Sequence, residues 1–457
     1  MLVKTFASAV YGINAQTITV EVNSGGLVMD GKNFYNLVGL PDSAVREGWQ
    51  RVEAAIKNIG FKLPRNKLTV NLAPADIRKE GAAYDLPIAL GVLGTFEAVD
   101  WTCFHEYVIM GELSLDGGLR PVKGVLPMAI QARKEGYKGL IVPSINAREA
   151  AIVDKLKVYA ANNLMEVVGF FNNSNALKQV AQDTRSLFNN RHQQYAVDFS
   201  DVKGQENIKR ALELAAAGGH NVILIGPPGA GKTMLARRMP TILPPLNLHE
   251  ALETTKIHSV AGLLSKNGAL VTERPFRAPH HTVSDAALVG GGSNPQPGEI
   301  SLAHHGVLFL DELPEFKRTV LEVLRQPMEE RKVTISRARI SVEYPASFML
   351  VASMNPCPCG YYNHPTKECV CGPGVVHRYL NKISGPLLDR IDLHVEVTPV
   401  SYEKLSSAEY SAETSKDIVE RVVAARLIQS ERFREVPDVY CNAQMPSRMV
   451  REVCRLD

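Results

Sequence analysis

The chain has 457 residues, of which 45% are hydrophobic, and it carries a formal net charge of +3. These values predict a globular protein of about three domains, and the nearly balanced charge neither requires nor excludes a nucleic acid partner, because any basic surface would have to be local. No segment approaches the ~20 consecutive apolar residues of a membrane span, so we expect a cytoplasmic protein without a membrane partner.

Residues 1–168 alternate between strand and helix patterns, which predicts a mixed α/β domain. A helix is expected from Ser43 to Ile59, closed by Gly60. Residues 171–195 are polar and contain neither proline nor glycine, so we expect a connector over 169–196, with a helix from Ala176 to Leu187. The remaining predicted elements of this part are strands at 16–22, 67–74, 107–117 and 139–144 and helices at 86–94 and 126–136.

Residues 77–93, 110–136 and 139–150 resemble the Lon-protease-like domain found at the front of magnesium-chelatase-like ATPases. Active proteases of this type use a serine nucleophile that a lysine base activates. On that pattern Ala83 stands at the serine position and Leu126 at the lysine position. Neither side chain can do this chemistry, and Lys123 nearby would have no nucleophile to activate. We therefore expect a scaffold for assembly or partner contact, not a peptidase.

A P-loop pattern, G-x-x-x-x-G-K-[ST], is matched without a gap by Gly-Pro-Pro-Gly-Ala-Gly-Lys-Thr at residues 226–233. The apolar run Val222 to Ile225 precedes it, as a buried parallel strand requires, and a helix is predicted to follow. Lys232 is expected to reach the β- and γ-phosphates of ATP and Thr233 to hold Mg²⁺. The other predicted nucleotide contacts come from the loop itself, at Gly226, Pro227, Pro228, Gly229, Ala230 and Gly231.

A second apolar run, residues 307–310, ends in two adjacent carboxylates, Asp311 and Glu312. This Walker B pattern predicts that Asp311 binds Mg²⁺ through its water shell and that Glu312 polarises the attacking water. A surface acidic pair is the alternative. Asn355 follows another buried strand and matches the sensor asparagine of AAA+ ATPases, although outside this context an asparagine there would only form a turn.

Two further resemblances to AAA+ ATPases extend the predicted nucleotide site. Residues 385–397 are similar to the stretch in which an arginine projects into the neighbouring subunit's site, and Arg390 takes that position. An ion pair with Asp389 or Asp392 in the same chain is the alternative. Residues 202–205 resemble the start of an AAA+ core, where adenine is held, so Val202 and Gly204 are candidate adenine contacts.

The segment between the two Walker motifs, residues 274–306, is rich in Gly, Pro and His and is expected to form inserted loops. Arg274, Arg277, His280 and His281 could suggest a metal or phosphate site. Paired histidines in loops are more often ordinary polar contacts, which is the interpretation that we adopt.

Residues 331–345 predict a β-hairpin, with Arg337 and Arg339 at its turn and Lys332 at its base. Such hairpins line the pore in related ring ATPases. These three side chains are our candidates for contacts with DNA phosphates. The alternative is that they are solvated charges or partners of residues on the opposite strand.

Four of the seven cysteines lie within fifteen positions, as two C-x-C pairs separated by residues 360–368. Four thiolates can complete a tetrahedral Zn²⁺ shell, which predicts a structural zinc site at Cys357, Cys359, Cys369 and Cys371. Since C-x-C is less usual than C-x-x-C, reduced loop cysteines remain the alternative.

The order of these motifs closely resembles the ComM/YifB family of magnesium-chelatase-like AAA+ proteins. The resemblance implies an α/β fold with a Lon-protease-like domain at 1–168 and, after the connector, an AAA+ P-loop NTPase core with a parallel sheet at 197–400. The start of a helical lid would follow at 401–457. The family pattern continues into another helical unit with a second sensor arginine, so we expect the lid to be incomplete.

The family also implies a function: an ATP-driven ring, a hexamer of identical subunits, that acts on single-stranded or branched DNA. Its members are helicases that promote branch migration during natural transformation and homologous recombination. A magnesium-chelatase subunit that drives Mg²⁺ into a porphyrin is the main alternative. A nucleotide-dependent scaffold that uses the inactive Lon-like domain is the other. The residues themselves support DNA binding only through local basic loops.

Overall fold

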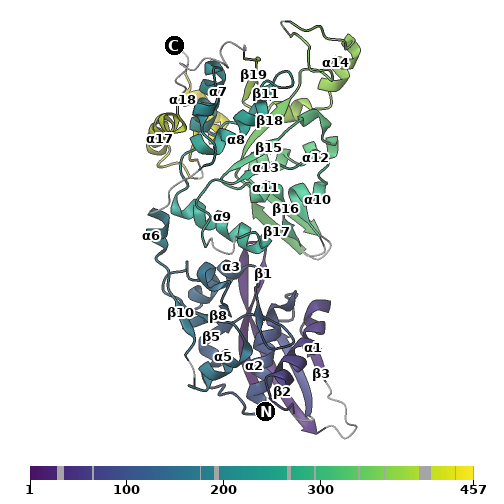
Figure 1. The fold of residues 1–457 in the computed structure, drawn as a ribbon, viewed down its shortest axis with the longest axis vertical. Helices are drawn as coiled ribbons and strands as arrows, with labels where there is room; N and C mark the ends of the chain where they lie inside the picture. The colour runs from purple at the N-terminus through teal and green to yellow at the C-terminus, as the bar shows by residue number, and fades with distance from the viewer. Residues whose placement is uncertain are drawn as a thin grey trace. The chain divides into compact units, whose positions relative to one another are not determined.

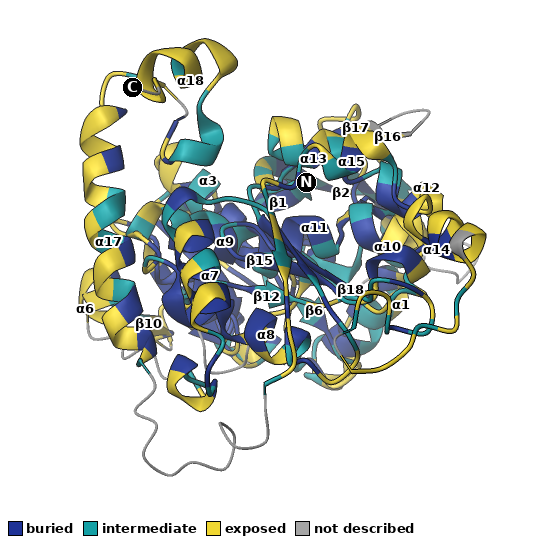
Figure 2. Cartoon of the chain, turned by 90° about the horizontal axis from the view of Figure 1, so that it is seen from above, coloured by how far each residue is buried: buried dark blue, intermediate teal, exposed yellow. Residues whose placement is uncertain are grey.

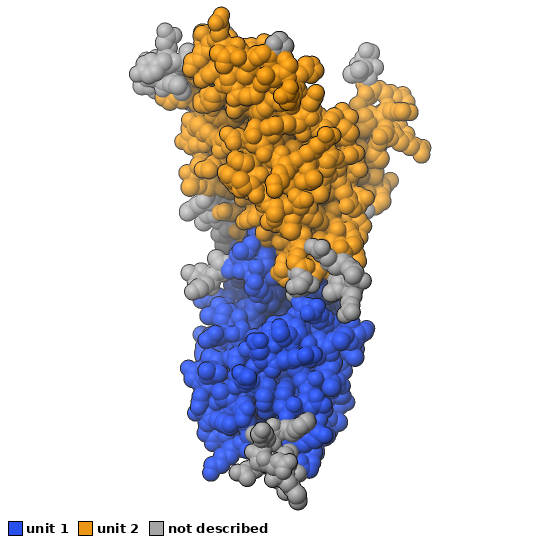
Figure 3. All heavy atoms as spheres, turned by 90° about the vertical axis from the view of Figure 1, so that its right-hand side faces the viewer, with its two compact units in different colours: residues 1–191, 255–271 blue, residues 192–254, 272–457 orange. Residues whose placement is uncertain are grey.

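The computed structural model of the chain describes residues 1–27, 35–63, 66–174, 176–189, 195–264, 269–292, 295–337, 340–364, 366–400, 413–437 and 439–455. It contains two compact units (Figures 1 and 3): unit 1 comprises residues 1–191 and 255–271, and unit 2 comprises residues 192–254 and 272–457. Helix α9 (Leu248–Ala261) contains the boundary between them. The units therefore differ from the expected domains, since residues 169–191 and 255–271 group with residues 1–168.

Unit 1 is built on one eight-stranded sheet of order β10-β9-β8-β5-β1-β2-β4-β3. Its strands are β1 (Leu2–Tyr11), β2 (Asn14–Leu27), β3 (Tyr35–Val38), β4 (Asn66–Ala73), β5 (Tyr107–Ile109), β8 (Gly139–Pro143), β9 (Lys157–Ala161) and β10 (Lys178–Val180). A separate small hairpin joins β6 (Glu112–Leu113) and β7 (Leu119–Arg120). The helices are α1 (Ser43–Asn58), α2 (Asp85–Thr95), α3 (Val125–Lys134), α4 (Ala147–Ala150), α5 (Leu164–Phe171) and α6 (Thr184–Asn189), with short 3₁₀ turns η1 (Ala82–Tyr84) and η2 (Phe104–Glu106).

The predicted helices of residues 1–168 and the strands predicted at 16–22, 67–74 and 139–144 are confirmed. The strand predicted at 107–117 is wrong in its extent: it is divided into β5 and β6, which lie in different sheets, and the chain then turns at Gly117, whose φ is 87°. Helix α1 shows why helix ends are predictable. Asp42 caps the helix by accepting a hydrogen bond from the Val45 backbone N–H at 2.8 Å. Val45, Val52 and Ile56 recur on one face and are buried, as an amphipathic helix requires. The helix ends before Gly60, which has a positive φ of 94°.

The predicted helix from Ala176 to Leu187 is wrong. Residues 178–180 instead form β10, which pairs antiparallel with β9 from Lys178↔Ala160 to Val180↔Val158. α6 begins only at Thr184. Pairing with the edge of the sheet satisfies the backbone of this polar segment, and local composition gives no sign of such a long-range partner.

Unit 2 contains a five-stranded sheet of order β12-β15-β18-β11-β19, whose neighbouring strands are all parallel. Its strands are β11 (Val222–Ile225), β12 (Phe276–Arg277), β15 (Val307–Leu310), β18 (Met349–Met354) and β19 (Leu393–Glu396). Two antiparallel pairs lie outside the sheet, β13 (Gly290–Gly291) with β14 (Gln296–Pro297) and β16 (Lys332–Arg337) with β17 (Ile340–Pro345). β15 and β18 are buried along their whole length (Figure 2), as their unbroken apolar runs predict.

The helices of unit 2 include α8, which directly follows the P-loop, and α17, the predicted first helix of the lid. Besides α9, they are α7 (Glu206–Gly218), α8 (Lys232–Ile242), α10 (Asp285–Val289), α11 (Glu299–Leu302), α12 (Arg318–Glu322), α13 (Arg325–Glu330), α14 (Pro373–Leu380), α15 (Gly385–Leu388), α17 (Ser415–Arg432) and α18 (Ser447–Val453), with 3₁₀ turns η3 (Phe199–Asp201), η4 (Leu313–Glu315) and η5 (Asn442–Gln444). Side chains from α7, α8 and α17 join the sheet in one apolar core. Within the described ranges, no helix combines the length and apolar character that crossing a bilayer would require.

Candidate functional site

The predicted nucleotide-binding groups meet at one edge of the parallel sheet of unit 2. β18 lies between β11 and β15, with Ile225 opposite Met354 and Leu310 opposite Ala352. Gly226, Asp311 and Asn355 directly follow the three strands. Since all three strands run in the same direction, their carboxyl ends place these residues together, where open α/β sheets bind ligands.

The P-loop crosses the end of the sheet at very close range. A Cβ added to Gly226 would lie 2.2 Å from the carbonyl oxygen of Val397, so only glycine fits there. The Gly226 N–H donates to the Met354 carbonyl at 3.2 Å, which fixes the start of the loop to β18. α8 then begins at Lys232, and its N-cap Gly231 belongs to the loop, so the N-terminus of the helix adjoins the loop, as phosphate binding requires.

Lys232 lies within this loop and is buried. Its Nζ donates to the carbonyl oxygens of Gly226 at 2.7 Å and Pro227 at 2.9 Å, and to Oδ1 of Asn355 at 3.0 Å. Burial lowers the pKa of Lys232. The last of these hydrogen bonds brings the predicted phosphate ligand and the predicted sensor residue together.

The predicted magnesium ligands are also in contact with each other. Thr233 Oγ1 donates to Asp311 Oδ2 at 2.8 Å, and the Ser353 hydroxyl donates to the other oxygen of the same carboxylate. A hydroxyl and a carboxylate oxygen are hard ligands of the kind that Mg²⁺ prefers, and Mg²⁺ usually keeps several waters in such sites. The residues present therefore fit a nucleotide-bound Mg²⁺.

Glu312 lies beyond the end of β15 in a left-handed conformation with φ of 55°, and its side chain is 57% exposed. His281 Nδ1 lies 3.7 Å from Glu312 Oε2. This contact was not predicted, because His281 was expected to be an ordinary loop residue. The available signal was the placement of the His280-His281-Thr282 triplet between the two Walker motifs.

The candidate adenine segment lies beside the P-loop, and the residue that joins them was not predicted. Val202 is buried, and Gly204 has a positive φ of 67°. Gln205 follows them, and its Nε2 donates to the carbonyl of P-loop residue Ala230 at 3.0 Å and to that of Thr398 at 3.1 Å. A glutamine held between two backbone carbonyls fixes this segment against the phosphate loop.

Arg390 follows α15 and contacts its own chain. Its guanidinium pairs with Glu329 and donates to the carbonyl of Pro386, while Nε is buried without a hydrogen-bond partner. Asp392, one of the pairing alternatives, instead accepts from the Asn221 N–H at 3.1 Å. Arg390 therefore pairs with Glu329 in its own chain, and not with the nearby Asp389 or Asp392 that the sequence suggested. Its insertion into a neighbouring subunit's site remains a prediction.

The predicted hairpin of residues 331–345 is confirmed. β16 and β17 pair antiparallel from Lys332↔Pro345 to Arg337↔Ile340. Lys332 forms a cross-strand ion pair with Glu343, with Nζ to Oε1 at 3.0 Å. The side chain of Arg337 and the whole of Arg339 lie outside the described residues, so their predicted DNA contacts remain predictions.

The four clustered cysteines converge as predicted, at Cys357, Cys359, Cys369 and Cys371, whose sulfurs all lie within 4.8 Å of one another. The Sγ atoms of Cys357, Cys359 and Cys369 are separated by 3.3 to 3.7 Å. A tetrahedral shell with Zn–S bonds of about 2.3 Å has sulfur–sulfur edges of about 3.8 Å. None of the four is in a disulfide. Donor chemistry and spacing therefore fit a closed four-thiolate metal site.

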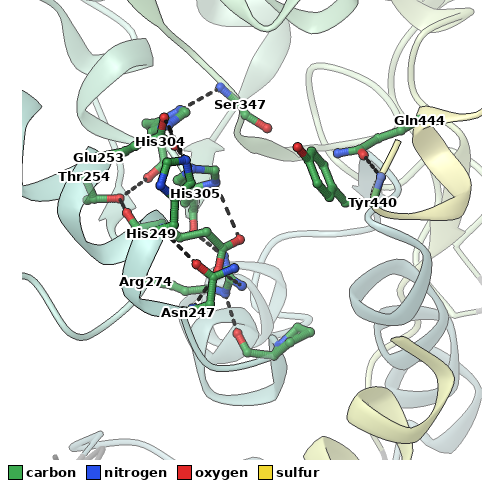
Figure 4. Close-up of polar contacts among 12 residues, drawn as sticks. Asn247, His249, Glu253, Thr254, Arg274, His304, His305, Ser347, Tyr440 and Gln444 are labelled. Carbon is green, nitrogen blue, oxygen red and sulfur yellow. Dashed lines mark hydrogen bonds and ion pairs between the residues drawn. The ribbon is translucent and has the colours of Figure 1, made fainter. Parts of the chain in front are cut away.

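A second cluster, Glu253, His304 and His305, was not predicted (Figure 4). Glu253 Oε2 lies 2.9 Å from His305 Nε2 and 3.6 Å from His304 Nε2. The Ser347 N–H donates to His304 Nδ1 at 3.0 Å, so neutral His304 carries its proton on Nε2, facing the carboxylate. A metal at Nε2 would need the opposite tautomer. The cluster is thus better suited to hydrogen bonding, which ties α9 to the residues just before β15.

This cluster makes the stability of unit 2 dependent on pH. Burial lowers the pKa of His304 to about 4, and the neighbouring imidazoles of His304 and His305 lower that of Glu253. Both shifts mean that the unfolded chain binds more protons, so stability falls as the pH drops below about 6.5. We expect His304→Gln to remove about 3 kcal/mol of the pH dependence between pH 6.5 and 4. Urea unfolding at several pH values in this range measures the free energy of unfolding, and His394→Gln, at an exposed histidine, is the control. The same dependence on pH in the unmodified protein and in both variants would contradict the prediction.

In unit 1, the structure places both residues that stand at the serine and lysine positions of the protease pattern in regular elements. Ala83 is in η1, and Leu126 is buried in α3. Beside them Asp85 pairs with Arg51, whose Nε donates to Oδ2 at 2.7 Å. Burial raises the pKa of Asp85 to about 6 although Arg51 opposes the shift. The groups at these two positions offer neither a nucleophile nor a base.

Comparison with known proteins agrees with this architecture. Residues 198–405 match the family described as magnesium chelatase, subunit ChlI, residues 9–146 match subunit ChlI of Mg-chelatase, and residues 412–457 match the C-terminal part of subunit ChlI. The competence protein ComM of Haemophilus influenzae is 42% identical over 99% of this chain and 86% of its own length. YifB of Escherichia coli is 44% identical over 98% of this chain and 85% of its own length. Lon protease 2 of Bacillus subtilis is 34% identical over 32% of this chain and 27% of its own length.

The parallel sheet, the P-loop and the two Walker carboxylates define a mixed α/β P-loop ATPase of the magnesium-chelatase type, for which ATP and Mg²⁺ are the implied ligands. Within that class, the chain belongs to the ComM/YifB family.

Proposed function

We propose that this protein is a cytoplasmic, ATP-driven DNA motor, a helicase that promotes branch migration during natural transformation and homologous recombination. One observation carries the proposal: the P-loop, Asp311 and Asn355 lie together at one sheet edge in a chain that is similar over 99% of its length to a protein named for competence. A protein that uses ATP hydrolysis to move incoming DNA would need these ATPase groups and would resemble a competence protein.

In this mechanism each residue at the sheet edge has a separate role in ATP binding or hydrolysis. Lys232 donates hydrogen bonds to phosphate oxygens. Thr233 and Asp311 would hold Mg²⁺, which would neutralise charge at the phosphates. Glu312 accepts the proton of the attacking water, and Asn355 orients that water. The exposure of Glu312 leaves it accessible to a water molecule, and His281 lies beside it.

Charge that develops on the γ-phosphate requires a further cation, and we assign this role to Arg390 acting on a neighbouring subunit. The proposal therefore includes a ring of identical subunits, a hexamer. Arg390 would have to exchange its contact with Glu329, whose side chain is 53% exposed, for the neighbour's nucleotide. Water reaches the Glu329 side of this pair, which weakens the attraction and permits the exchange.

Two other parts of the chain have structural roles in this proposal. The four cysteines bind one structural Zn²⁺ per chain, because four-cysteine closure leaves no open position for catalysis. Unit 1 has a Lon-like fold that serves as a scaffold. The 34% identity to part of Lon protease 2 supports that fold, while Ala83 and Leu126 argue against peptidase activity.

A motor that tracks DNA must grip its backbone, and we propose Arg337 and Arg339 for this grip, with Lys332 at the hairpin base. Replacing both arginines by alanine should weaken binding to unrelated DNA sequences alike. The salt dependence should flatten by about one unit for each phosphate that is no longer bound, while hydrolysis without DNA persists. Fluorescence anisotropy at several salt concentrations measures the slope. An unchanged slope in the double variant would refute the role of the hairpin.

The helicase proposal is tested with forked and four-way branched DNA at low salt. With a non-hydrolysable ATP analogue the protein should bind both substrates, and with ATP it should displace strands or move the branch point. Failure to bind either substrate would exclude the helicase function and favour the chelatase subunit or the scaffold. The Glu312→Gln protein is the control: any strand movement that it produces would not depend on ATP hydrolysis.

A chelatase subunit is the second candidate, because the family matched by residues 198–405 is described as magnesium chelatase, subunit ChlI. In that function ATP turnover would drive Mg²⁺ into a porphyrin, and DNA would not affect the rate. A nucleotide-dependent scaffold would likewise show no response to DNA. The response of ATP turnover to DNA therefore separates the motor from both.

A further inference from the structure

The four-cysteine loop begins beside the nucleotide site and leads into α14. Cys357 follows sensor residue Asn355 by two positions and is completely buried. The second cysteine pair ends at Cys371, just before α14. The loop of residues 357–371 is thus inserted between the sensor strand β18 and α14, and both of its ends are anchored in the ATPase core.

The turn of this loop packs directly on the P-loop. The Gly360 N–H donates to the Cys357 carbonyl at 2.9 Å, and Gly360 has a positive φ of 84°. A Cβ added to Gly360 would lie 2.5 Å from Cδ and 3.2 Å from Cγ of Pro228. Pro228 is the third residue of the P-loop, and its rigid ring cannot give way as a flexible side chain would. The position of this turn therefore limits the position of the P-loop.

The two ends of the loop act on Asn355. Its side chain accepts the hydrogen bond from Lys232. Tyr379 of α14 lies near its backbone: burial raises the pKa of Tyr379 to about 12, and the Asn355 N–H opposes that shift. Tyr379 is itself buried. Asn355 is consequently held from one side by the P-loop lysine and from the other by the helix that follows the second cysteine pair.

We propose that the four-cysteine loop is a metal-dependent brace of the nucleotide site, with Gly360 and Tyr379 as the positioning residues through which it acts on Pro228 and Asn355. This inference rests on the proposed function, both for the zinc and for ATP binding. Without a metal, only weak contacts join the four thiols, because neutral thiols hydrogen-bond weakly and thiolates repel one another. The loop then loses its closure, and the P-loop loses the surface on which Pro228 rests.

The test compares two glycine substitutions in the same loop. Gly360→Ala should raise the dissociation constant of a fluorescent ATP analogue about tenfold while zinc content stays at one per chain. Gly372→Ala is the matched control: Gly372 lies beside Cys371 with φ of −66°, and an added Cβ there would meet nothing within 4 Å. It should leave affinity and zinc content unchanged. Normal nucleotide affinity in a zinc-loaded Gly360→Ala protein would overturn the brace and leave the proposed function standing.

A second measurement covers the case in which Gly360→Ala does not fold. Zinc is removed from the unmodified protein with a chelator, the chelator is removed, and Mg²⁺ is restored before ATP-analogue binding is measured. Affinity should fall about tenfold and return when one equivalent of Zn²⁺ is added. Unchanged affinity after zinc removal would overturn the inference alone. Absence of zinc from the freshly purified protein would overturn the zinc proposal and the metal dependence together, and absence of ATP binding would overturn the proposed ATPase.

Discussion

Replacement of Lys232 by alanine is expected to abolish ATP binding or to weaken it at least a hundredfold. The ammonium group is buried at the centre of the phosphate loop and supplies the positive charge for the phosphate chain there. A charge-assisted hydrogen bond in such a site contributes about 1.5–3 kcal/mol, so losing the two expected bonds, to the β- and γ-phosphates, exceeds the roughly 2.7 kcal/mol of a hundredfold weakening. Alanine has no group that could replace them. Equilibrium titration with a fluorescent ATP analogue measures the weakening directly.

The control for this experiment is Lys416→Ala, which removes an exposed lysine from α17 in the same unit. It should bind the nucleotide like the unmodified protein. Because Lys232 also holds Gly226, Pro227 and Asn355 together, thermal unfolding of both variants without nucleotide must be measured too. Unchanged affinity in a folded Lys232→Ala protein would exclude the P-loop as the nucleotide site.

Replacement of Glu312 by glutamine is expected to leave ATP binding intact and to reduce turnover by about 10²–10⁴-fold. Glutamine preserves the size of the side chain but cannot accept the proton of the attacking water. Glu312 has no direct contact with Lys232 among the described interactions, which is why binding should persist. The measurement is steady-state release of phosphate at saturating ATP, alongside a binding titration.

Glu315→Gln supplies the matched control, because Glu315 is a nearby exposed carboxylate whose partner is Lys382, at 3.3 Å. It should hydrolyse ATP at close to the normal rate. Turnover at the normal rate by Glu312→Gln, with Glu315→Gln also normal, would show that the catalytic assignment is wrong.

The secondary structure around the site could be predicted because it depends on local pattern. The apolar runs at Val222–Ile225 and Val307–Leu310 predict strands buried on both faces, and the structure places them in the interior of a parallel sheet. The P-loop and the Walker carboxylates could be identified because their residues occur at fixed positions relative to a strand. The strand order then brings the carboxyl ends of β11, β15 and β18 together at one edge.

The contacts that could not be predicted from the sequence all join segments that are far apart in the chain. His281 lies beside Glu312, Gln205 joins Ala230, and Gly360 packs on Pro228. No periodicity encodes such contacts, since they depend on the order of strands in the sheet and on the path of the loops between them. The same reason explains the missed strand β10, whose polar residues gain their partners from β9.

The most direct test of the central claim is the rate of ATP hydrolysis measured with and without forked DNA. We predict that saturating DNA raises the turnover of the unmodified protein several-fold in the presence of Mg²⁺, and that Glu312→Gln turns over at least about a hundredfold more slowly under both conditions. An unmodified protein that hydrolyses ATP at the same rate with and without DNA would contradict a DNA motor and favour the chelatase or scaffold function.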